Sequence, residues 1–457
     1  MEPYRTRLVR LVIVLGVLAA ALMLGYVATK KKPLYALLVA VIPVLLIGLD
    51  RVVRHRQLGP LVVLLAALFI PWSLPTGTES RLVISLVLTT LFVTTWVLQM
   101  LVERRIRLAP SVVNTPLLGF MGVTFFSLLW SNVYRDPLVL TWKSFPIVQT
   151  ASAFVMIMLP GAFLLVANQI QDLRLLKSLT AIMLLAGGLG LIRQYGNISL
   201  PVNTGGLFSM WIITLSTGLA FFNRQLSWKV RGLLLALSAA WIIWGFALHI
   251  SWLAGWLPGL VALGVLCFIR SKKLTLVLIL LLLAVVVAKW DYFDNVLNSE
   301  SRESGMTRLA AWEINWRITS QHWLFGTGPA GYAAYYMSYF PTEGMATHNN
   351  YLDILAQTGV SGFILCLWFF GTLVWAGHKL ARRLKGRGDF QEGLANAALA
   401  GTLGCIVIMG FGDWLFPFAY TQSIAGFDYA VYNWLFMGTI LVLDRLTQTE
   451  PRGMASA

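Results

Sequence analysis

The chain has 457 residues, of which 58% are hydrophobic and 12% are charged, a composition that excludes an ordinary soluble protein and is typical of many membrane spans. Its formal net charge of +16 does not indicate a nucleic-acid-binding protein, because the basic residues are spread over short segments between apolar runs. Cys267, Cys366 and Cys405 all lie in apolar runs and predict packing residues, with no disulfide framework.

Apolar runs follow one another along the chain, and each is long enough, or nearly so, to cross a bilayer as a helix. Fourteen candidates can be counted, at 11–27, 34–49, 59–75, 82–102, 113–132, 147–168, 178–192, 206–222, 232–250, 252–269, 274–289, 359–377, 394–412 and 429–444. They lack the alternation of barrel strands, and backbone groups in lipid must be satisfied within the segment. The sequence therefore predicts an all-α, polytopic integral membrane protein with about 12–14 transmembrane helices.

The polar residues divide the chain into three parts. We expect a transmembrane helical bundle over 1–290, a periplasmic catalytic loop with short helices over 291–358, and C-terminal transmembrane helices with a cytoplasmic tail over 359–457. With the N-terminus in the cytoplasm, the inner loops hold 24 basic and 8 acidic residues and so carry the whole net charge of +16, as the positive-inside rule expects. Lys30-Lys31-Lys32 is the exception and falls outside.

The long polar segment predicts two short helices. The first covers about 307–320, where Leu309, Trp312 and Trp316 form one apolar stripe that faces the membrane surface or the helix bundle. The second covers about 349–357, with Gly359 as its C-cap. Between them lies the glycine-rich stretch 326–331, which follows no strand and so does not indicate a nucleotide-binding loop.

His348 precedes the second helix, where the positive end of the helix dipole disfavours an imidazolium and favours a neutral imidazole that can act as a general base. A capping or hydrogen-bonding histidine is the alternative. The other histidines show no His-x-x-x-His spacing, and Asp291 and Asp294 have no nearby third ligand, so no metal site is predicted.

Two arginines are candidates for binding an anion on the same side. Arg308 lies in the first short helix, and Arg193 lies at the outer end of a span, where an ionisable group needs a partner or an anionic ligand. The alternative for each is an arginine that extends to the membrane interface. Arg135, Lys143, Arg302 and Arg317 are weaker candidates of the same kind.

The residues of the polar segment carry a resemblance to a known family. Arg308-Leu309-Ala310-Ala311-Trp312, Trp323-Leu324-Phe325-Gly326-Thr327-Gly328 and the stretch from His348-Asn349-Asn350-Tyr351-Leu352-Asp353 to Gly362 resemble the O-antigen ligase and polymerase superfamily, and within it lipopolysaccharide O-antigen ligase. The resemblance extends to the whole topology and is most specific at the His-Asn-x-Tyr-Leu core.

This resemblance implies an inverting, metal-independent glycosyltransferase without a cofactor. Its donor would be O-antigen on undecaprenyl diphosphate, its acceptor lipid A-core, and its place the bacterial inner membrane with the active site facing the periplasm. His348 and Arg308 would be catalytic, with Arg193 assisting at the diphosphate. Asn349, Asn350 and Tyr332 would position sugars or orient His348, with a helix-start role as the alternative for the two asparagines. Trp312 would offer a flat face to a sugar or lipid, with packing as its alternative.

One motif departs from the family. Many relatives carry a Ser-Arg-Gly-Ala-like turn where this chain has Ser251-Trp252-Leu253-Ala254-Gly255-Trp256, so no arginine role can be assigned there.

Two other enzymes are alternatives: an O-antigen polymerase or a protein O-oligosaccharyltransferase would use the same donor. A transporter would need ionisable residues near mid-span and inverted repeats, and neither is evident.

Overall fold

The computed structural model describes residues 56–75, 81–248, 253–291, 294, 305–341 and 347–449. The chain divides into two compact units, Met1–Gly59 and Pro60–Ala457. Of the first unit, only the 3-10 turn η1 (Arg56–Leu58) and Gly59 are described. The predicted spans at 11–27 and 34–49 lie outside the described residues.

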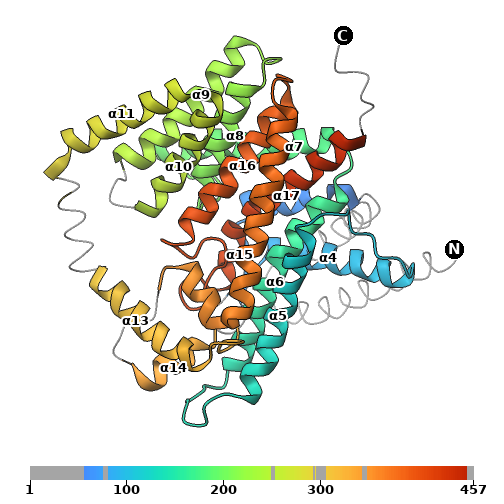
Figure 1. Cartoon of the computed structure of the whole chain (residues 1–457), viewed down its shortest axis with the longest axis vertical. Coiled ribbons are helices and arrows are strands. Elements are labelled where there is room, and N and C mark those ends of the chain that lie inside the picture. The colour runs from blue at the N-terminus through green and yellow to red at the C-terminus, as the bar shows by residue number, and fades with distance from the viewer. Residues whose placement is uncertain are drawn as a thin grey trace, which may run out of the picture. The chain divides into compact units, whose positions relative to one another are not determined.

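The described part of the second unit is helical apart from one small ribbon (Figure 1). The ribbon joins β1 (Ser73–Pro75) to β2 (Arg81–Val83) in antiparallel register, with Ser73 opposite Val83. The first helices are α3 (Gly59–Phe69), α4 (Ile84–Val102), α5 (Asn114–Val133), α6 (Phe145–Gln169), α7 (Leu173–Gly196), α8 (Phe208–Phe222) and α9 (Trp228–Ile242), which continues as the π-helical η2 (Ile243–Leu248). The later ones are α10 (Leu253–Arg270), α11 (Lys272–Ala288), α13 (Gly305–Gln321), α14 (Tyr332–Tyr339), α15 (Asn350–Leu384), α16 (Phe390–Ile408), the 3-10 turn η4 (Ile424–Gly426) and α17 (Phe427–Thr449).

This architecture confirms the predicted all-α polytopic membrane protein. Within the described ranges, 8 helices are long and apolar enough to cross a membrane. The predicted runs at 59–75, 206–222 and 252–269 correspond to the shorter apolar helices α3, α8 and α10, and the run at 274–289 corresponds to α11. The small ribbon and α14 were not predicted.

The helices pack through small residues and buried aromatic rings. A Cβ atom on Gly218 of α8 would lie 2.8 Å from the Cβ of Ala397 in α16, so the glycine permits close approach of these two helices. Trp211 of α8 stacks on Phe436 of α17 with ring centroids 5.2 Å apart, and its Nε1 donates to Asn433 Oδ1 at 2.7 Å. These contacts join α8, α16 and α17 into one core.

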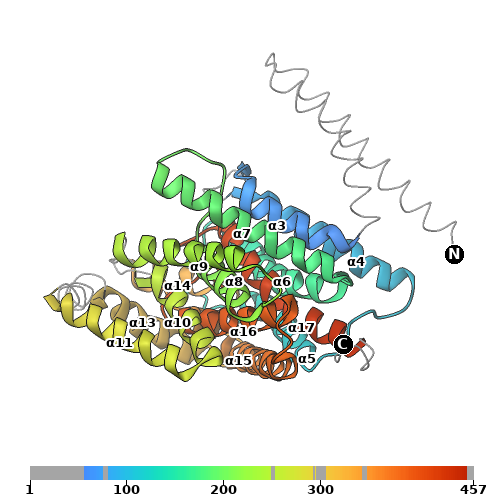
Figure 2. The same ribbon diagram turned by 90° about the horizontal axis from the view of Figure 1, so that it is seen from above.

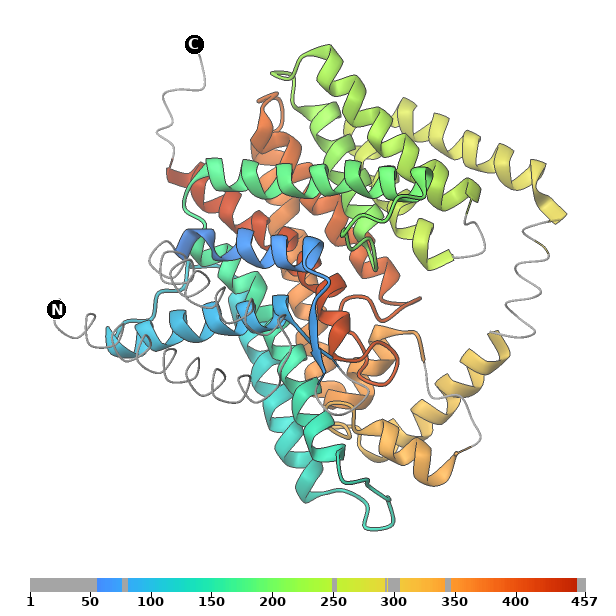
Figure 3. The same cartoon turned by 180° about the vertical axis from the view of Figure 1, so that it is seen from behind.

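Helix α15 connects two chemically different ends of this unit. It begins at Asn350, just after His348, and ends at Leu384, within the basic stretch 379–387. The turn between α5 and α6 lies at the same end as α13 and α14, as Figures 1 and 3 both show. In Figure 2, α15 is seen nearly end on, next to α5 and α16. The described part of the long polar segment from Gly305 onward is therefore folded against one end of the helix bundle.

The two predicted short helices are present in this segment. The helix predicted at 307–320 is α13, and the one predicted at 349–357 is the first part of α15. Gly359 interrupts α15 with φ 67° and ψ −172°, a conformation that suits glycine, and the helix then continues to Leu384. The break separates the short outer helix from the span, as the sequence predicts.

Candidate functional site

His348 lies in a tight turn at the start of α15. Its φ of 47° places it in the left-handed region, and its side chain is 42% exposed. The next residue, Asn349, is the N-cap of α15, and its side-chain oxygen accepts hydrogen bonds from the N–H groups of Tyr351 and Leu352. The turn thus presents the imidazole to the surface while the following residue anchors the helix.

A buried carboxylate lies beside this imidazole. Asp413, in the loop between α16 and η4, is 2% exposed and accepts hydrogen bonds from Thr421 Oγ1 at 2.5 Å and Gln422 Nε2 at 2.9 Å. His348 Nδ1 lies 3.8 Å from Asp413 Oδ1, which is longer than a hydrogen bond but within ion-pair range. Burial alone would raise the pKa of Asp413, but His348 and the Thr421 hydrogen bond outweigh it and lower the pKa, so the carboxyl stays charged.

A second buried carboxylate fixes the residue before His348. Asp353 Oδ1 accepts hydrogen bonds from Thr347 Oγ1 at 2.6 Å and from Tyr332 Oη at 2.7 Å. Tyr332 is fully buried, and burial followed by the neighbouring Asp353 raises the pKa of its phenol. On the other side, Trp312 Nε1 of α13 donates to the Thr347 carbonyl at 2.8 Å. Thr347 is therefore bonded directly to α13 and α15, and Tyr332 of α14 bonds to the same Asp353 carboxyl.

Asn350 holds the loop that carries Asp413. Its Nδ2 donates to the Phe416 carbonyl at 2.8 Å, and its Oδ1 accepts from the N–H groups of Leu415 and Phe416, each at 3.2 Å. Its own N–H donates to the Met409 carbonyl at 2.7 Å. Since its side chain is completely buried, Asn350 positions the Asp413 loop against the start of α15.

The turn between α5 and α6 clamps α14 from outside. Tyr339 Oη donates to Asp136 Oδ2 at 2.6 Å, and the Leu140 N–H donates to Ser338 Oγ at 2.8 Å. The hydrogen bond from Tyr339, followed by one from the Leu138 N–H, lowers the pKa of Asp136. This clamp fixes the helix from which Tyr332 contacts Asp353.

The two predicted arginines lie on different helices, α7 and α13. Arg193, at the end of α7, is exposed and donates through a guanidinium nitrogen to the carbonyl of Val202 in the following loop. That loop contacts the start of α17 where Tyr432 Oη donates to the Gly205 carbonyl. Arg308 belongs to α13, and its side chain lies outside the described residues.

Arg135, a weaker candidate, is committed to local contacts. It donates to Asn132 Oδ1 at 2.9 Å and lies over the ring of Phe145, 4.8 Å from its centroid. Burial lowers the pKa of its guanidinium. Arg317, another weak candidate, pairs with Glu313 of its own helix at 2.5 Å. Neither contact involves His348.

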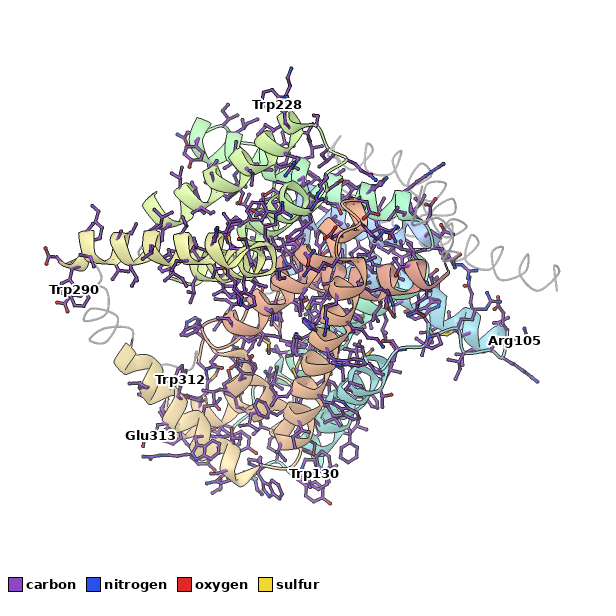
Figure 4. The ribbon with its side chains drawn as sticks, turned by 45° about the horizontal axis from the view of Figure 1, so that its top comes forward. Arg105, Trp130, Trp228, Trp290, Trp312 and Glu313 are labelled. Atoms are coloured by element: carbon purple, nitrogen blue, oxygen red, sulfur yellow. The ribbon has the colours of Figure 1, made fainter. Side chains whose placement is uncertain are left out.

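The structure brings the predicted residues together in two layers. His348 is at the surface, whereas Asn349, Asn350 and Tyr332 bond to backbone or carboxylate groups beneath it. Trp312 is half-buried on the side of α13 toward the bundle, while Glu313 points outward (Figure 4). These four side chains favour the positioning interpretation over direct sugar contact.

The sequence did not indicate Asp413 as a site residue, and it indicated no role for Asp353. Asp353 stands inside the recognised motif, so its place could have suggested one. Asp413 lies 65 positions beyond His348, and its only signal was an acidic residue directly after an apolar run on the outer side. Their juxtaposition depends on the packing of α16 against α15.

The arrangement can carry acid–base chemistry at an exposed imidazole. A neutral imidazole nitrogen can take a proton from a hydroxyl group, and the charged Asp413 would stabilise the imidazolium that forms. Among the described residues, no three His, Cys, Asp or Glu side chains are grouped to hold a metal ion.

Residues 230–367 match the family model described as O-Antigen ligase. The matched range contains α13, α14 and the start of α15, and therefore Arg308, Tyr332 and His348. Arg193 and Asp413 lie outside it. No curated protein matches the chain.

Proposed function

We propose that this chain, whose residues 230–367 match the O-antigen ligase family model, transfers O-antigen from undecaprenyl diphosphate to lipid A-core. The observation that carries the proposal is the half-exposed His348 imidazole beside the buried, charged Asp413. A hydroxyl acceptor needs a base at the surface, and the base needs a partner that stabilises its protonated form. The pair supplies both.

The reaction proceeds in one displacement. His348 takes the proton of an acceptor hydroxyl, and that oxygen bonds to the anomeric carbon of the donor sugar. The bond from that carbon to the diphosphate oxygen breaks on the opposite face, which inverts the configuration. Arg308 and Arg193 bind the departing diphosphate, whose charge guanidinium groups stabilise without a metal ion.

The protein is a multi-pass membrane protein, and we place its site on the periplasmic side of the inner membrane. Two features support this orientation. His348 stands at one end of α15, and the basic stretch 379–387 stands at the other. Since ATP is absent outside the cytoplasm, the energy of the new bond comes from the activated donor.

The proposal is tested by measuring glycan transfer by the reconstituted protein. The donor is lipid-linked O-antigen, and two acceptors are offered together, lipid A-core and a second lipid-linked repeat. Elongation of lipid A-core supports the ligase, whereas elongation of the repeat identifies a polymerase. His348→Ala should lower the transfer rate by about 10² to 10⁴-fold. His378→Ala, at the exposed inner end of α15, is the matched control and should retain the rate. Undiminished transfer by His348→Ala would remove the base from the mechanism.

A chelator tests the metal-free part of the proposal separately. We expect the transfer rate to be unchanged after chelation of divalent ions, because arginines rather than a metal bind the diphosphate. A rate that is lost in chelator and restored by added divalent ion would contradict this part alone.

A further inference from the structure

The outward face of α13 carries large exposed apolar side chains, with the exposed Glu313–Arg317 pair beside them. Leu309 is 62% exposed and Trp316 is 59% exposed, and residues seven apart lie on one side of a helix. Trp323, seven residues further and just beyond the helix end, is 61% exposed. The opposite side of α13 is buried, with Ala311 at 1% and Ile318 at 4%. We call Leu309, Trp316 and Trp323 the α13 stripe.

The end of α13 lies level with the outer turns of a spanning helix. Ser127 Oγ of α5 donates to the Phe325 carbonyl at 2.6 Å, and the Phe325 ring contacts those of Phe126 and Trp130 at centroid distances of 4.7 and 5.2 Å. Six residues separate the level of Ser127 from the end of α5 at Val133, so Ser127 lies about 9 Å along the helix axis from that end. This depth is the interfacial zone in which tryptophan and tyrosine rings concentrate.

The irregular backbone at this depth has its hydrogen bonds satisfied, as lipid requires. The Val360 N–H donates to the Trp323 carbonyl at 2.7 Å, and Ser361 Oγ donates to the Leu324 carbonyl at 2.7 Å. The Thr327 N–H donates to the Ala356 carbonyl at 2.9 Å. The break in α15 at Gly359 provides room for this pairing, since a Cβ there would lie 2.4 Å from the Leu324 carbonyl carbon.

We propose that the α13 stripe is a docking surface for the outer leaflet of the membrane that the bundle spans. The stripe continues the exposed apolar side of α5, where Leu129 is 52% and Val133 is 73% exposed. A spanning helix already presents that side to lipid, so the adjoining rings of Trp316 and Trp323 meet the same bilayer. The Glu313–Arg317 pair beside the stripe faces the polar headgroups.

Docking of α13 on the membrane would also position the turn at His348, because α13 is hydrogen-bonded to that turn. Trp312, on the side of α13 toward the bundle, donates its Nε1 to the Thr347 carbonyl, and the Ala311 carbonyl accepts a 2.5 Å hydrogen bond from Tyr336 Oη. The helix therefore contacts lipid on one side and positions the residue before His348 on the other. A bilayer would hold the turn in place through α13.

Spin labels at three positions of the full chain test the proposal. Trp316→Cys, Trp323→Cys and the matched control Arg317→Cys are labelled with a nitroxide and reconstituted in vesicles of phosphatidylethanolamine and phosphatidylglycerol. Arg317 is one position from Trp316, on the same helix, and its side chain is 63% exposed. The three native cysteines are buried, and the wild-type chain treated with the same label measures any background labelling of them.

Collision of each label with oxygen, which concentrates in lipid, is compared with collision with a water-soluble nickel chelate. We expect oxygen to dominate at 316 and 323, and the nickel chelate to dominate at 317. Equal nickel access at 316 and 317 would overturn the proposal. Low access of both reagents at 316 would also overturn it, because the stripe would then be covered by protein. Circular dichroism of each variant before reconstitution verifies its helix content.

Discussion

In the spanning helices, buried threonines bond to carbonyls of their own helix, whereas around His348 buried polar side chains bond to residues far away in the sequence. Thr124 donates to the Phe120 carbonyl and Thr402 to the Ala398 carbonyl, each four positions back. Asn350, by contrast, donates to the carbonyl of Phe416, 66 positions on. Tyr332 Oη likewise donates to Asp353 Oδ1, 21 positions on and in another helix.

The difference separates two kinds of stability. A bond within one turn forms with the helix itself and depends little on neighbouring elements. A bond between distant residues forms only when both elements are in place, and its loss leaves a buried group unpaired. The site is therefore the part of the molecule in which single substitutions should have the largest effects.

The largest effect is expected at the distant pair of His348 and Asp413. Asp413→Asn removes the charge that stabilises the imidazolium while keeping the side-chain shape, so the transfer rate should fall by about 10² to 10³-fold. The rate is measured on reconstituted protein under saturating acceptor. Wild-type rates in a folded variant would show that His348 works without the carboxylate.

The same variant gives a test by pH. The pKa of Asp413 is lowered in the folded protein, so its stabilising contribution is present above its ordinary value of about 3.9 and is lost as the pH falls through the folded pKa. The difference in unfolding free energy between wild type and Asp413→Asn should be constant down to about pH 4 and shrink below it. Thermal unfolding in detergent at several pH values measures it. A difference that vanishes already near neutrality would contradict the lowered pKa.

Gly359 and Gly371 form a matched pair on α15. Gly359 has φ 67°, and an added Cβ would lie within 2.5 Å of the backbone of Leu324 and Phe325, whereas Gly371 has nothing within 4 Å. Gly359→Ala should cost about 3 kcal/mol or more of unfolding free energy. Gly371→Ala should be neutral or stabilise by up to about 1 kcal/mol. Equal melting temperatures for the two variants would show that the break in α15 is not required.

Two buried asparagines compare distant with local bonding directly. Asn350 is 0% exposed and bonds to Leu415 and Phe416, whereas Asn396 is 2% exposed and donates only to the Glu392 carbonyl of its own helix. Asn350→Leu should cost about 2–4 kcal/mol, because it leaves backbone groups unpaired. Asn396→Leu should change stability by less than about 1 kcal/mol, because its Oδ1 has no partner to lose. A larger loss of unfolding free energy for Asn396→Leu than for Asn350→Leu, measured by thermal unfolding, would contradict the greater weight given to distant bonds.

The smallest effect is expected at Thr402. Thr402→Val removes one hydroxyl that donates to the Ala398 carbonyl of its own helix at 2.7 Å, so the cost should be about 0.5 kcal/mol. Thermal unfolding of this variant and of the wild type measures the loss of unfolding free energy, which should be smaller than the loss for Asn350→Leu. A cost above about 2 kcal/mol would place Thr402 among the residues that join separate elements.

The sequence determined the class of fold and most of the helices, and it predicted the short helices beside the candidate site. Long apolar runs must be helical in lipid, and this physical constraint requires no tertiary information. The start of α15 near Asn349 and its break at Gly359 were both predicted, because caps and glycine conformations are local properties. The motif around His348 likewise indicated the family that the match over residues 230–367 supports.

The tertiary structure decided which side chains support the turn at that histidine: Asp413 beside its imidazole, and Tyr332 through Asp353 and Thr347. Asp413 and Tyr332 lie on different elements from His348, and no periodicity connects positions so far apart along the chain. It also decided which side of α13 is buried. Leu309 and Trp316 stay exposed while Ala311 and Ile318 pack inward, although an apolar stripe by itself fits either lipid or protein. Local rules act within a few residues, and the chemistry of this site depends on contacts that only the packed helices bring together.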